Sequence, residues 1–338
     1  MTTSPPATTQ LGLQEIYDLA YDCLTQNGAN DANATALANT IHNAERDGSH
    51  SHGLFRLPAY VTSLRSGKVK GDASPTPTDV TPAVIRLHGD NGYAPISHEV
   101  GLPLLADAAS RLGVAVLSIT HVHHMAALWP EVEYLADRGL VGLACTPYMP
   151  AVAPAGATQA LFGTNPISFA WPRPNSTPVV YDMATASMAM GEVQIAAREG
   201  HDVPLGTGLN AKGEMTTNPS DIADGGVLLP FGGYKGSAIA MMVELLAAGL
   251  VGENFSYEAK ENDNGDGGPP QGGQFILAMS PSVISAKNYE EHCEGFFTKL
   301  TGLEGVRLPG ERRHKNRLSD APRSINAALV EKIRSLMS

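Results

Sequence analysis

Two side chains with complementary chemistry, His52 and Arg56, lie four residues apart within the polar stretch 47–56. Residues at this spacing share one face of a helix, so the imidazole and the guanidinium would point the same way. An imidazole exchanges a proton near neutral pH, and a guanidinium grips a carboxylate through two parallel hydrogen bonds. Ser51 precedes the imidazole and could orient it. A solvated helix cap bearing surface histidines would have the same sequence, so both interpretations stay open.

Three more histidines, His121, His123 and His124, fall within four residues. With Glu131 or Glu133 they could supply zinc ligands. Neighbouring residues at a strand end point to opposite sides, however, and neither the H-x3-H nor the H-E-x-x-H spacing is present. The pattern favours a loop between a strand and a helix, which is where ligands collect in α/β proteins.

Two strand-to-turn transitions follow, over residues 161–166 and 181–185, and their polar groups could contact a ligand or form ordinary turns. Glu192 and Glu199 lie in the next helix-like stretch, and either carboxylate could partner an imidazole. A solvated charge is favoured for Glu199.

A glycine-rich turn over residues 231–237 carries Lys235 at the start of an apolar helix, an arrangement that suits a phosphate or a simple turn into a buried helix. Residues 307–313 form a basic run in an acidic chain, and beside a dinucleotide this run could hold a 2′-phosphate. Neither G-x-G-x-x-G after an early strand nor the Walker spacing occurs. The residues alone therefore indicate an α/β enzyme of undefined chemistry.

The elements that must position these groups divide at a Gly/Pro/Thr-rich loop over residues 67–82. Before it, apolar spacing predicts helices over 11–27, 31–46 and 54–64. After it, strands are predicted over 83–87, 114–119, 140–145, 179–181 and 274–279, alternating with helices over 97–112, 124–138, 235–250 and 286–300. This alternation is typical of an α/β body. Residues 260–273 form a polar excursion, and 325–337 a closing amphipathic helix.

Composition narrows the function further. The 338 residues carry 23 Lys and Arg against 34 Asp and Glu, a net charge of -11. So acidic a chain is poorly suited to nucleic acid or an anionic membrane surface. The longest apolar run, residues 238–251, is interrupted by Glu244 and is too short to span a bilayer. Three dispersed cysteines and an N-terminus without signal-peptide features favour a soluble protein of the reducing cytoplasm.

Seven blocks of this sequence, taken together, resemble the malate/L-lactate dehydrogenase family of non-Rossmann oxidoreductases, and within it the bacterial cyclic ketimine reductases. The blocks are residues 47–60, 123–144, 161–166, 181–185, 191–200, 228–250 and 307–313. They are long and in order. The resemblance implies an α/β fold with a mostly antiparallel mixed sheet flanked by helices, which binds NADPH without the glycine fingerprint. It also implies a homodimer.

The resemblance implies roles for individual residues as well. His52 would donate a proton, polarised by Ser51 and Glu192, while Arg56 and Thr164 would bind substrate. The residues implied at the cofactor are His124, Met125, Ala126, Ala127, Leu128, Asp182, Met183, Ala184, Tyr234, Lys235, Arg307, Leu308, Pro309, Gly310, Glu311, Arg312 and Arg313. This chain has Glu192 where the family's reductases carry Asp, and Tyr234 where they carry His.

The expected reaction is the NADPH-dependent reduction of Δ1-piperideine-2-carboxylate or Δ1-pyrroline-2-carboxylate, both small cyclic imino acids, to L-pipecolate or L-proline. The same Arg–His pair would serve an NAD(P)-dependent 2-oxoacid or 2-hydroxyacid dehydrogenase, and a non-catalytic metal-binding protein is a more remote alternative. The expected organisation is a tail over 1–10, a helical substrate-side domain over 11–75 joined by the helix 320–338, and a cofactor-binding and dimerisation body over 76–319.

Overall fold

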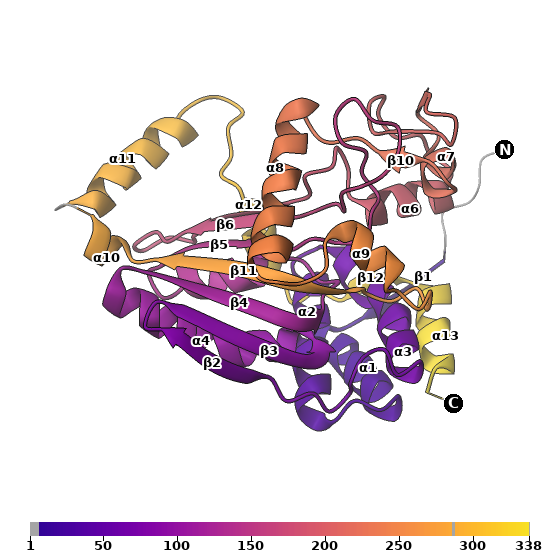
Figure 1. Cartoon of the computed structure of the whole chain (residues 1–338), viewed down its shortest axis with the longest axis horizontal. Helices are drawn as coiled ribbons and strands as arrows, with labels where there is room; N and C mark the ends of the chain where they lie inside the picture. Colours follow the sequence, from indigo (N-terminus) through magenta and orange to yellow (C-terminus); the bar gives the residue numbers. More distant parts are fainter. Residues whose placement is uncertain (1–6, 286–287, 338) are drawn as a thin grey trace.

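The computed structural model describes residues 7–285 and 288–337. Its centre is a seven-stranded sheet with strand order β2-β3-β4-β11-β5-β6-β7 (Figure 1). These strands are β2 (Thr76–Thr81), β3 (Val84–Tyr93), β4 (Val114–His123), β5 (Val141–Cys145), β6 (Ile167–Trp171), β7 (Val179–Met183) and β11 (Gln271–Met279). Strands β3 and β4 pair in parallel, and the other neighbours pair antiparallel. The predicted α/β class, with a mostly antiparallel mixed sheet, is confirmed.

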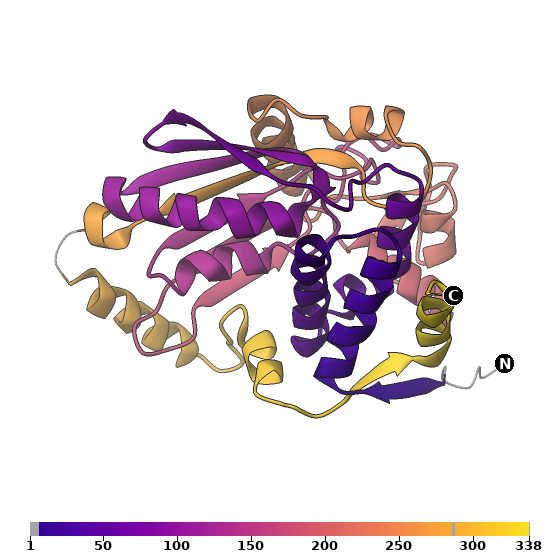
Figure 2. The ribbon, with the colours of Figure 1, turned by 90° about the horizontal axis from the view of Figure 1, so that it is seen from below.

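Helices pack on both faces of this sheet (Figures 1 and 2). Helices α4 (Ala94–Leu112) and α5 (Trp129–Ala136) bury Leu105 and Val132 against Leu117 of β4 in the largest apolar cluster. On the opposite face, α8 (Tyr234–Glu244) continues into a π-helical segment, Leu245–Leu250. Because apolar side chains alternate along the strands, both faces acquire a packed core.

A second apolar core joins the two ends of the described chain (Figure 2). Helices α1 (Leu13–Gln26), α2 (Asp31–Arg46) and α3 (Leu57–Arg65) pack with the last helix, α13 (Ala327–Ser335). Strand β1 (Thr8–Leu11) pairs antiparallel with β12 (Arg323–Asn326). Residues 8–10, which the sequence placed in a tail, are therefore part of a two-stranded ribbon, because β12 supplies backbone partners that lie more than 300 positions away.

The residues that follow β7 and precede α8 in the sequence form a smaller lobe. It contains α6 (Met190–Glu199), α7 (Pro219–Ala223) and a three-stranded sheet of β10 (Val227–Leu228), β8 (Gly208–Leu209) and β9 (Met215–Thr216). The sequence indicated α6 but none of these short strands, because strands of two residues carry no periodic signal. The first turn of α6 forms part of the candidate site described below.

Several predicted boundaries moved. Strand β2 falls inside the predicted loop 67–82, because an edge strand tolerates proline and needs few apolar residues. Residues 124–128 form a loop before α5 rather than a helical turn. In the predicted excursion, α9 (Ser256–Glu261) ends and β11 begins. The predicted helix 286–300 corresponds to α11 (Tyr289–Thr301), which follows α10 (Pro281–Ile284), and residues 286–287 lie outside the described chain. Across the described residues, no helix combines the length and the apolar character that a membrane crossing needs.

Candidate active site

The polar stretch after α2 folds into two short 3-10 turns, His50–His52 and Leu54–Arg56, instead of one helix. Glu45, at the end of α2, is buried and holds both turns. Its carboxylate accepts hydrogen bonds from the Leu54 backbone N–H (2.8 Å) and from His50 Nδ1 (2.6 Å). A Cβ on Gly53 would lie 2.1 Å from Glu45 Oε1, so only glycine fits there. His50 is therefore turned to Glu45, which leaves His52 for the cleft.

The His52 ring is oriented by its neighbour, since Nδ1 lies 3.1 Å from Ser51 Oγ. Burial, with smaller contributions from Arg56 and His124, lowers the pKa of His52 to about 3. The sequence-based mechanism assumed an ordinary imidazole pKa of ~6.5. In the ligand-free site the ring is instead neutral at pH 7, so His52 can act as an acid only after the surrounding charge changes.

Arg56 is fixed at one nitrogen, because its Nε donates to the Ser51 carbonyl at 2.8 Å. Its terminal nitrogens make no hydrogen bond within the described residues, and they stay available for a planar anion. One of them, Nη2, would lie 2.9 Å from a Cβ at position 191, so Gly191 leaves the room that the guanidinium needs. The guanidinium also lies over the Phe55 ring, 5.3 Å from its centroid.

A cleft of about 490 Å³ collects most of the predicted catalytic and substrate residues. Besides Ser51, His52, Arg56, Thr164, His124, Met125 and Ala126, it is lined by Thr146, Tyr148, Met149, Pro150, Ala151, Pro166, Ala189, Met190, Gly191, Gln194, Ala223 and Gly267. The lining combines apolar side chains with convergent polar groups, as small-molecule sites generally do. Glu192 is not among these residues: it is exposed at the start of α6 and makes no hydrogen bond within the described chain.

Thr164 reaches the cleft from a strained turn. The next residue, Asn165, has a positive φ of 39°, and its buried amide donates to Glu244 Oε1 at 2.8 Å. The Thr164 carbonyl accepts a hydrogen bond from the Thr185 backbone at 2.9 Å, which ties this turn to the end of β7. The turn is thus held from two sides, through the Asn165 amide and through the Thr164 carbonyl.

Several of the predicted cofactor residues form a second group around β7. Asp182 accepts hydrogen bonds from the backbone N–H groups of Leu128 (2.7 Å) and Trp129 (3.1 Å), and burial raises its pKa to about 6. The basic run lies alongside: the Val180 N–H donates to the Pro309 carbonyl at 3.2 Å. Arg313 donates to the Val180 carbonyl at 2.9 Å, and its buried Nε is left without a partner in the described chain.

The remaining predicted cofactor residues differ in exposure. Residues 307–313 line a hollow of about 400 Å³, and α12 (Glu311–Arg317) begins inside this run. Arg307 and Arg312 are exposed and unpaired within the described residues. Tyr234 and Lys235 are also exposed, at the first turn of α8. Ala127 and Leu128 are buried, Met183 is exposed, and Ala184 packs on the cluster of the small lobe.

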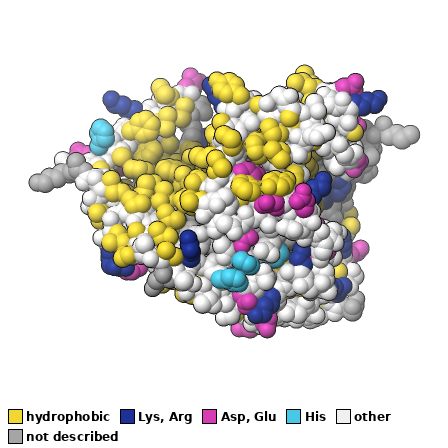
Figure 3. Space-filling view, viewed as in Figure 1, with side chains coloured by type: hydrophobic (Ala, Val, Ile, Leu, Met, Phe, Trp, Pro, Cys, Tyr) yellow, Lys and Arg dark blue, Asp and Glu magenta, His cyan; other side chains and the backbone are white. Residues whose placement is uncertain are grey.

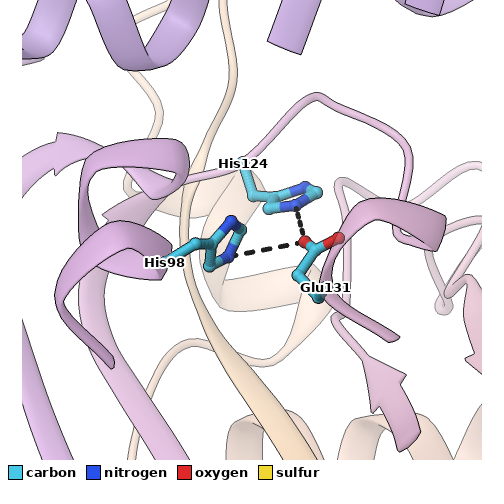
Figure 4. A group of neighbouring side chains, drawn as sticks. All are labelled: His98, His124 and Glu131. Carbon is cyan, nitrogen blue, oxygen red and sulfur yellow. Dashed lines mark hydrogen bonds and ion pairs between the residues drawn. The ribbon is translucent and has the colours of Figure 1, made fainter. Parts of the chain in front are cut away.

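The histidine run does not converge on one point. His121 Nδ1 pairs with Glu253 at 3.0 Å, and His123 Nδ1 bonds to the Pro269 carbonyl at 3.1 Å. His124 instead faces Glu131 and His98 (Figure 4). The zinc grouping of His121, His123 and His124 considered from the sequence is therefore wrong. The strand is irregular at His121, which has a positive φ of 54°, and His124 follows the end of β4, so the three rings reach different partners.

Sequence reasoning missed several contributors to this site, among them Gly191, Gly267, His98 and Gln274. Gly191 belongs to a block that was recognised, but nothing in the sequence shows which side chain approaches it. The others come from the polar excursion, α4 and β11, and only the tertiary fold brings them to the cleft or behind it.

Comparison with known proteins places the chain in a family. Residues 11–334 match the malate/L-lactate dehydrogenase family. A Δ1-pyrroline-2-carboxylate/Δ1-piperideine-2-carboxylate reductase of Pseudomonas syringae pv. tomato is 45% identical over 303 residues, which cover 90% of this chain and 88% of the relative. A Δ1-pyrroline-2-carboxylate reductase of Ancylobacter novellus is 42% identical over 311 residues, 91% of each chain.

A solved structure gives the same result. The crystal structure of Δ1-piperideine-2-carboxylate reductase from Pseudomonas syringae pv. tomato superposes with a TM-score of 0.92 at 43% identity, covering 97% of this chain and 100% of that one. The chain thus belongs to the malate/L-lactate dehydrogenase family and is an oxidoreductase, which confirms the family predicted from the sequence.

Proposed function

We propose that this protein reduces cyclic ketimines that carry a 2-carboxylate, namely Δ1-piperideine-2-carboxylate and Δ1-pyrroline-2-carboxylate, to L-pipecolate and L-proline with NADPH. The observation that carries the proposal is the pairing of a free guanidinium face on Arg56 with the half-buried imidazole of His52 in one cleft. The relatives named as reductases of these two substrates support the same reaction.

Arg56 binds and aims the substrate. Because Nε is already committed to Ser51, the two terminal nitrogens form the pair that matches the two oxygens of a carboxylate. Holding the carboxylate there fixes the adjacent C=N bond relative to His52, and orientation of this kind supplies a large share of a typical rate enhancement. Thr164 lines the same cleft and is proposed to contact the substrate.

His52 handles the proton. Reduction of C=N adds a hydride to carbon and a proton to nitrogen, and His52 would provide that proton. The substrate carboxylate neutralises Arg56, whose charge helps to keep His52 deprotonated, so binding itself favours the imidazolium. The Ser51 hydroxyl serves both forms of the ring, donating to Nδ1 when it is bare and accepting from it when it is protonated.

Glu192 is proposed to support the imidazolium from the start of α6. Its neighbours Gly191 and Gln194 line the same cleft as His52. We expect Glu192→Gln to lower kcat while leaving substrate KM nearly unchanged, because the carboxylate acts on the acid and not on the bound carboxylate. Glu199→Gln, further along the same helix and exposed, is the matched control.

Bound NADPH would supply the hydride. The residues around β7 fit this group chemically: Arg307 and Arg312 have unpaired guanidinium groups, and the buried Nε of Arg313 lacks a partner in the described chain. Unpaired arginine donors of this kind match phosphate oxygens. We propose that Arg307 and Arg312 select NADPH over NADH. Arg312→Ser should raise KM for NADPH at least 10-fold and leave KM for NADH unchanged.

We also propose that the protein is a homodimer of the reducing cytoplasm. Figure 3 shows hydrophobic side chains gathered over α8 and the neighbouring part of the sheet. Among them, Met241, Leu245 and Leu250 are more than half exposed. A contiguous apolar face of this kind marks an interface. Light scattering coupled to size-exclusion chromatography should give twice the 35.5 kDa chain mass. For the cytoplasm, the support is three free cysteines, of which Cys23 and Cys145 are buried.

Steady-state kinetics test the proposed reaction. The two cyclic imines are compared with pyruvate and oxaloacetate, each with NADPH and with NADH. We expect kcat/KM for at least one imine to exceed kcat/KM for either 2-oxoacid by 100-fold or more. Preference for a 2-oxoacid would make the protein a hydroxyacid dehydrogenase. His52→Ala should then lower kcat far more than it weakens NADPH binding.

A further inference from the structure

A hydrogen-bond network includes one residue of the cleft, and Figure 4 shows three of its members, His98, His124 and Glu131. It joins His98 of α4, Glu131 of α5 and Gln274 of β11 to His124, which lines the cleft. His98 Nε2 donates to Gln274 Oε1 at 2.5 Å, and Gln274 Nε2 donates to Glu131 Oε1 at 3.0 Å. His124 Nε2 faces the same carboxylate oxygen at 3.4 Å. Three elements distant in sequence therefore converge on one side chain of the site.

The directions of these bonds follow from chemistry. The Gln274 carbonyl oxygen can only accept, so His98 must carry its proton on Nε2. Burial would raise the pKa of Glu131, but His98 and His124 outweigh it and lower that pKa, so the carboxylate is ionised at neutral pH. An ionised carboxylate can only accept as well, and His124 therefore keeps its proton on Nε2.

The other ring nitrogen of His124, Nδ1, makes no hydrogen bond within the described chain. Because Nε2 is held by Glu131, Nδ1 is the nitrogen left to the cleft. Of the described side chains that line the cleft, His124 alone is bonded to a carboxylate. Within the described residues, His52 bonds only to the Ser51 hydroxyl. The buried carboxylate of this site thus acts on the second imidazole and not on the first.

We propose that Glu131 is a positioning residue, which holds His124 by Nε2–H so that Nδ1 is presented to the ligand as a hydrogen-bond acceptor. His98 and Gln274 fix Glu131 in turn. The acceptor fits an N–H donor, and, resting on the proposed function, two groups qualify: the carboxamide of the nicotinamide and the protonated ring nitrogen of the imine. A carboxylate that fixes the tautomer of a working imidazole through its far nitrogen is a general device of protein sites.

The same atoms could be considered for a metal ion, since ligand atoms of His98, His124 and Glu131 lie within 4.8 Å of one another. Gln274 argues against it. Its amide bonds to His98 Nε2 and to Glu131 Oε1, so these two candidate ligand atoms already take part in hydrogen bonds, whereas Glu131 Oε2 has no partner within the described chain. One stoichiometric metal ion per chain after purification, lost with Glu131→Gln, would overturn the proposal in favour of a metal site.

The tautomer can be measured directly on the ligand-free protein. Two-bond proton–nitrogen correlation spectra of protein labelled with 15N-histidine distinguish the two tautomers, and His124→Asn identifies the signal by its disappearance. We expect the neutral ring of wild-type His124 to carry its proton on Nε2. Glu131→Gln should shift part of the population to Nδ1–H, because a neutral amide holds the proton less strongly. A wild-type ring protonated on Nδ1 alone, or an unchanged spectrum in the variant, would overturn the proposal.

Glu133→Gln is the matched control. Glu133 is buried on the same helix two residues later, but it pairs with Arg317 at 2.8 Å and not with a residue of the cleft. This variant should lose stability and leave the His124 signals in place. Should Glu131→Gln fail to fold, Gln274→Leu removes the bond that fixes Glu131 and is expected to shift the His124 population in the same direction.

Two binding measurements then separate the ligand groups. If the acceptor serves the carboxamide, Glu131→Gln raises the Kd for NADPH about 10-fold, measured by quenching of tryptophan fluorescence. If it serves the imine, KM for the imine rises by that factor at saturating NADPH while the Kd for NADPH stays constant. If neither the Kd for NADPH nor the KM for the imine changes, the assignment of Nδ1 to a ligand is overturned. A wild-type protein inactive on imines would refute the proposed function, whereas the tautomer result stands without it.

Discussion

Binding of a carboxylate in the cleft should draw a proton onto His52. In the free site its pKa is about 3, and a proton held there at pH 7 costs about 5 kcal/mol, since each of the roughly four units is worth about 1.36 kcal/mol. A ligand carboxylate on Arg56, about 4 Å from the imidazole at an effective dielectric constant of about 20, returns about 4 kcal/mol. This corresponds to about three pKa units, which raises the pKa of His52 in the complex to about 6.

A suitable probe is furan-2-carboxylate, a flat five-membered ring with the substrate's carboxylate and a ring oxygen that can accept a hydrogen bond, but no imine to reduce. Calorimetric titration at one pH in two buffers of different ionisation enthalpy, MES and Bis-Tris, counts the protons taken up. The expected uptake is about half a proton at pH 6 and less than a tenth at pH 7.5, because the complex titrates near pH 6 and the free site near pH 3.

His52→Gln is the control, because it removes the titrating ring and keeps a polar side chain of similar reach. The variant should bind the probe without any buffer-dependent heat. If the wild type takes up no proton at pH 6, or if the uptake survives in the variant, the charge coupling between Arg56 and His52 is refuted.

Three further predictions concern Gly191, His123 and Lys68. Gly191→Ala should raise substrate KM at least 10-fold, because the new Cβ displaces the Arg56 guanidinium; steady-state kinetics check this. The variant should lose no thermal stability, because alanine favours the helix, and a melting curve checks this. Burial lowers the pKa of His123 to about 4, so the unfolded chain binds more protons between pH 6.5 and pH 4, and stability is lost as the pH falls through this window. Between pH 7 and pH 5 the wild type should lose about 2 kcal/mol more than His123→Gln in urea unfolding. Lys68→Met should loosen the loop that brings Gly267 to the cleft, because Lys68 pairs with Asp263 (2.8 Å) and Asp266 (2.5 Å) of that loop. Limited proteolysis should therefore cut this loop faster in the variant than in the wild type.

The fold class and the residues of the site could be predicted from the sequence better than the arrangement of those residues in space. His52 and Arg56 could be singled out because a polar cluster between two amphipathic helices is unusual and the two side chains are chemically complementary. Their actual arrangement, two 3-10 turns held by Glu45, depends on one buried carboxylate whose role no local pattern indicates.

The pKa values of buried groups could not be predicted from the sequence either. The ordinary pKa assumed for His52 failed because burial is a property of the folded chain, and the same holds for the raised pKa of Asp182. Glu192 was selected by its place in a recognised block, yet the carboxylate that bonds to a cleft imidazole is Glu131. Its partners His98 and Gln274 come from α4 and β11, and they meet only because these elements pack side by side.

The most direct test of the proposed site is a crystal structure of the protein with NADP+ and furan-2-carboxylate. We expect the ligand carboxylate to lie on the two terminal nitrogens of Arg56 and the ring oxygen to lie within hydrogen-bond reach of His52, with the nicotinamide stacked on the ligand ring. A ligand bound elsewhere, or a carboxylate turned away from Arg56, would contradict it.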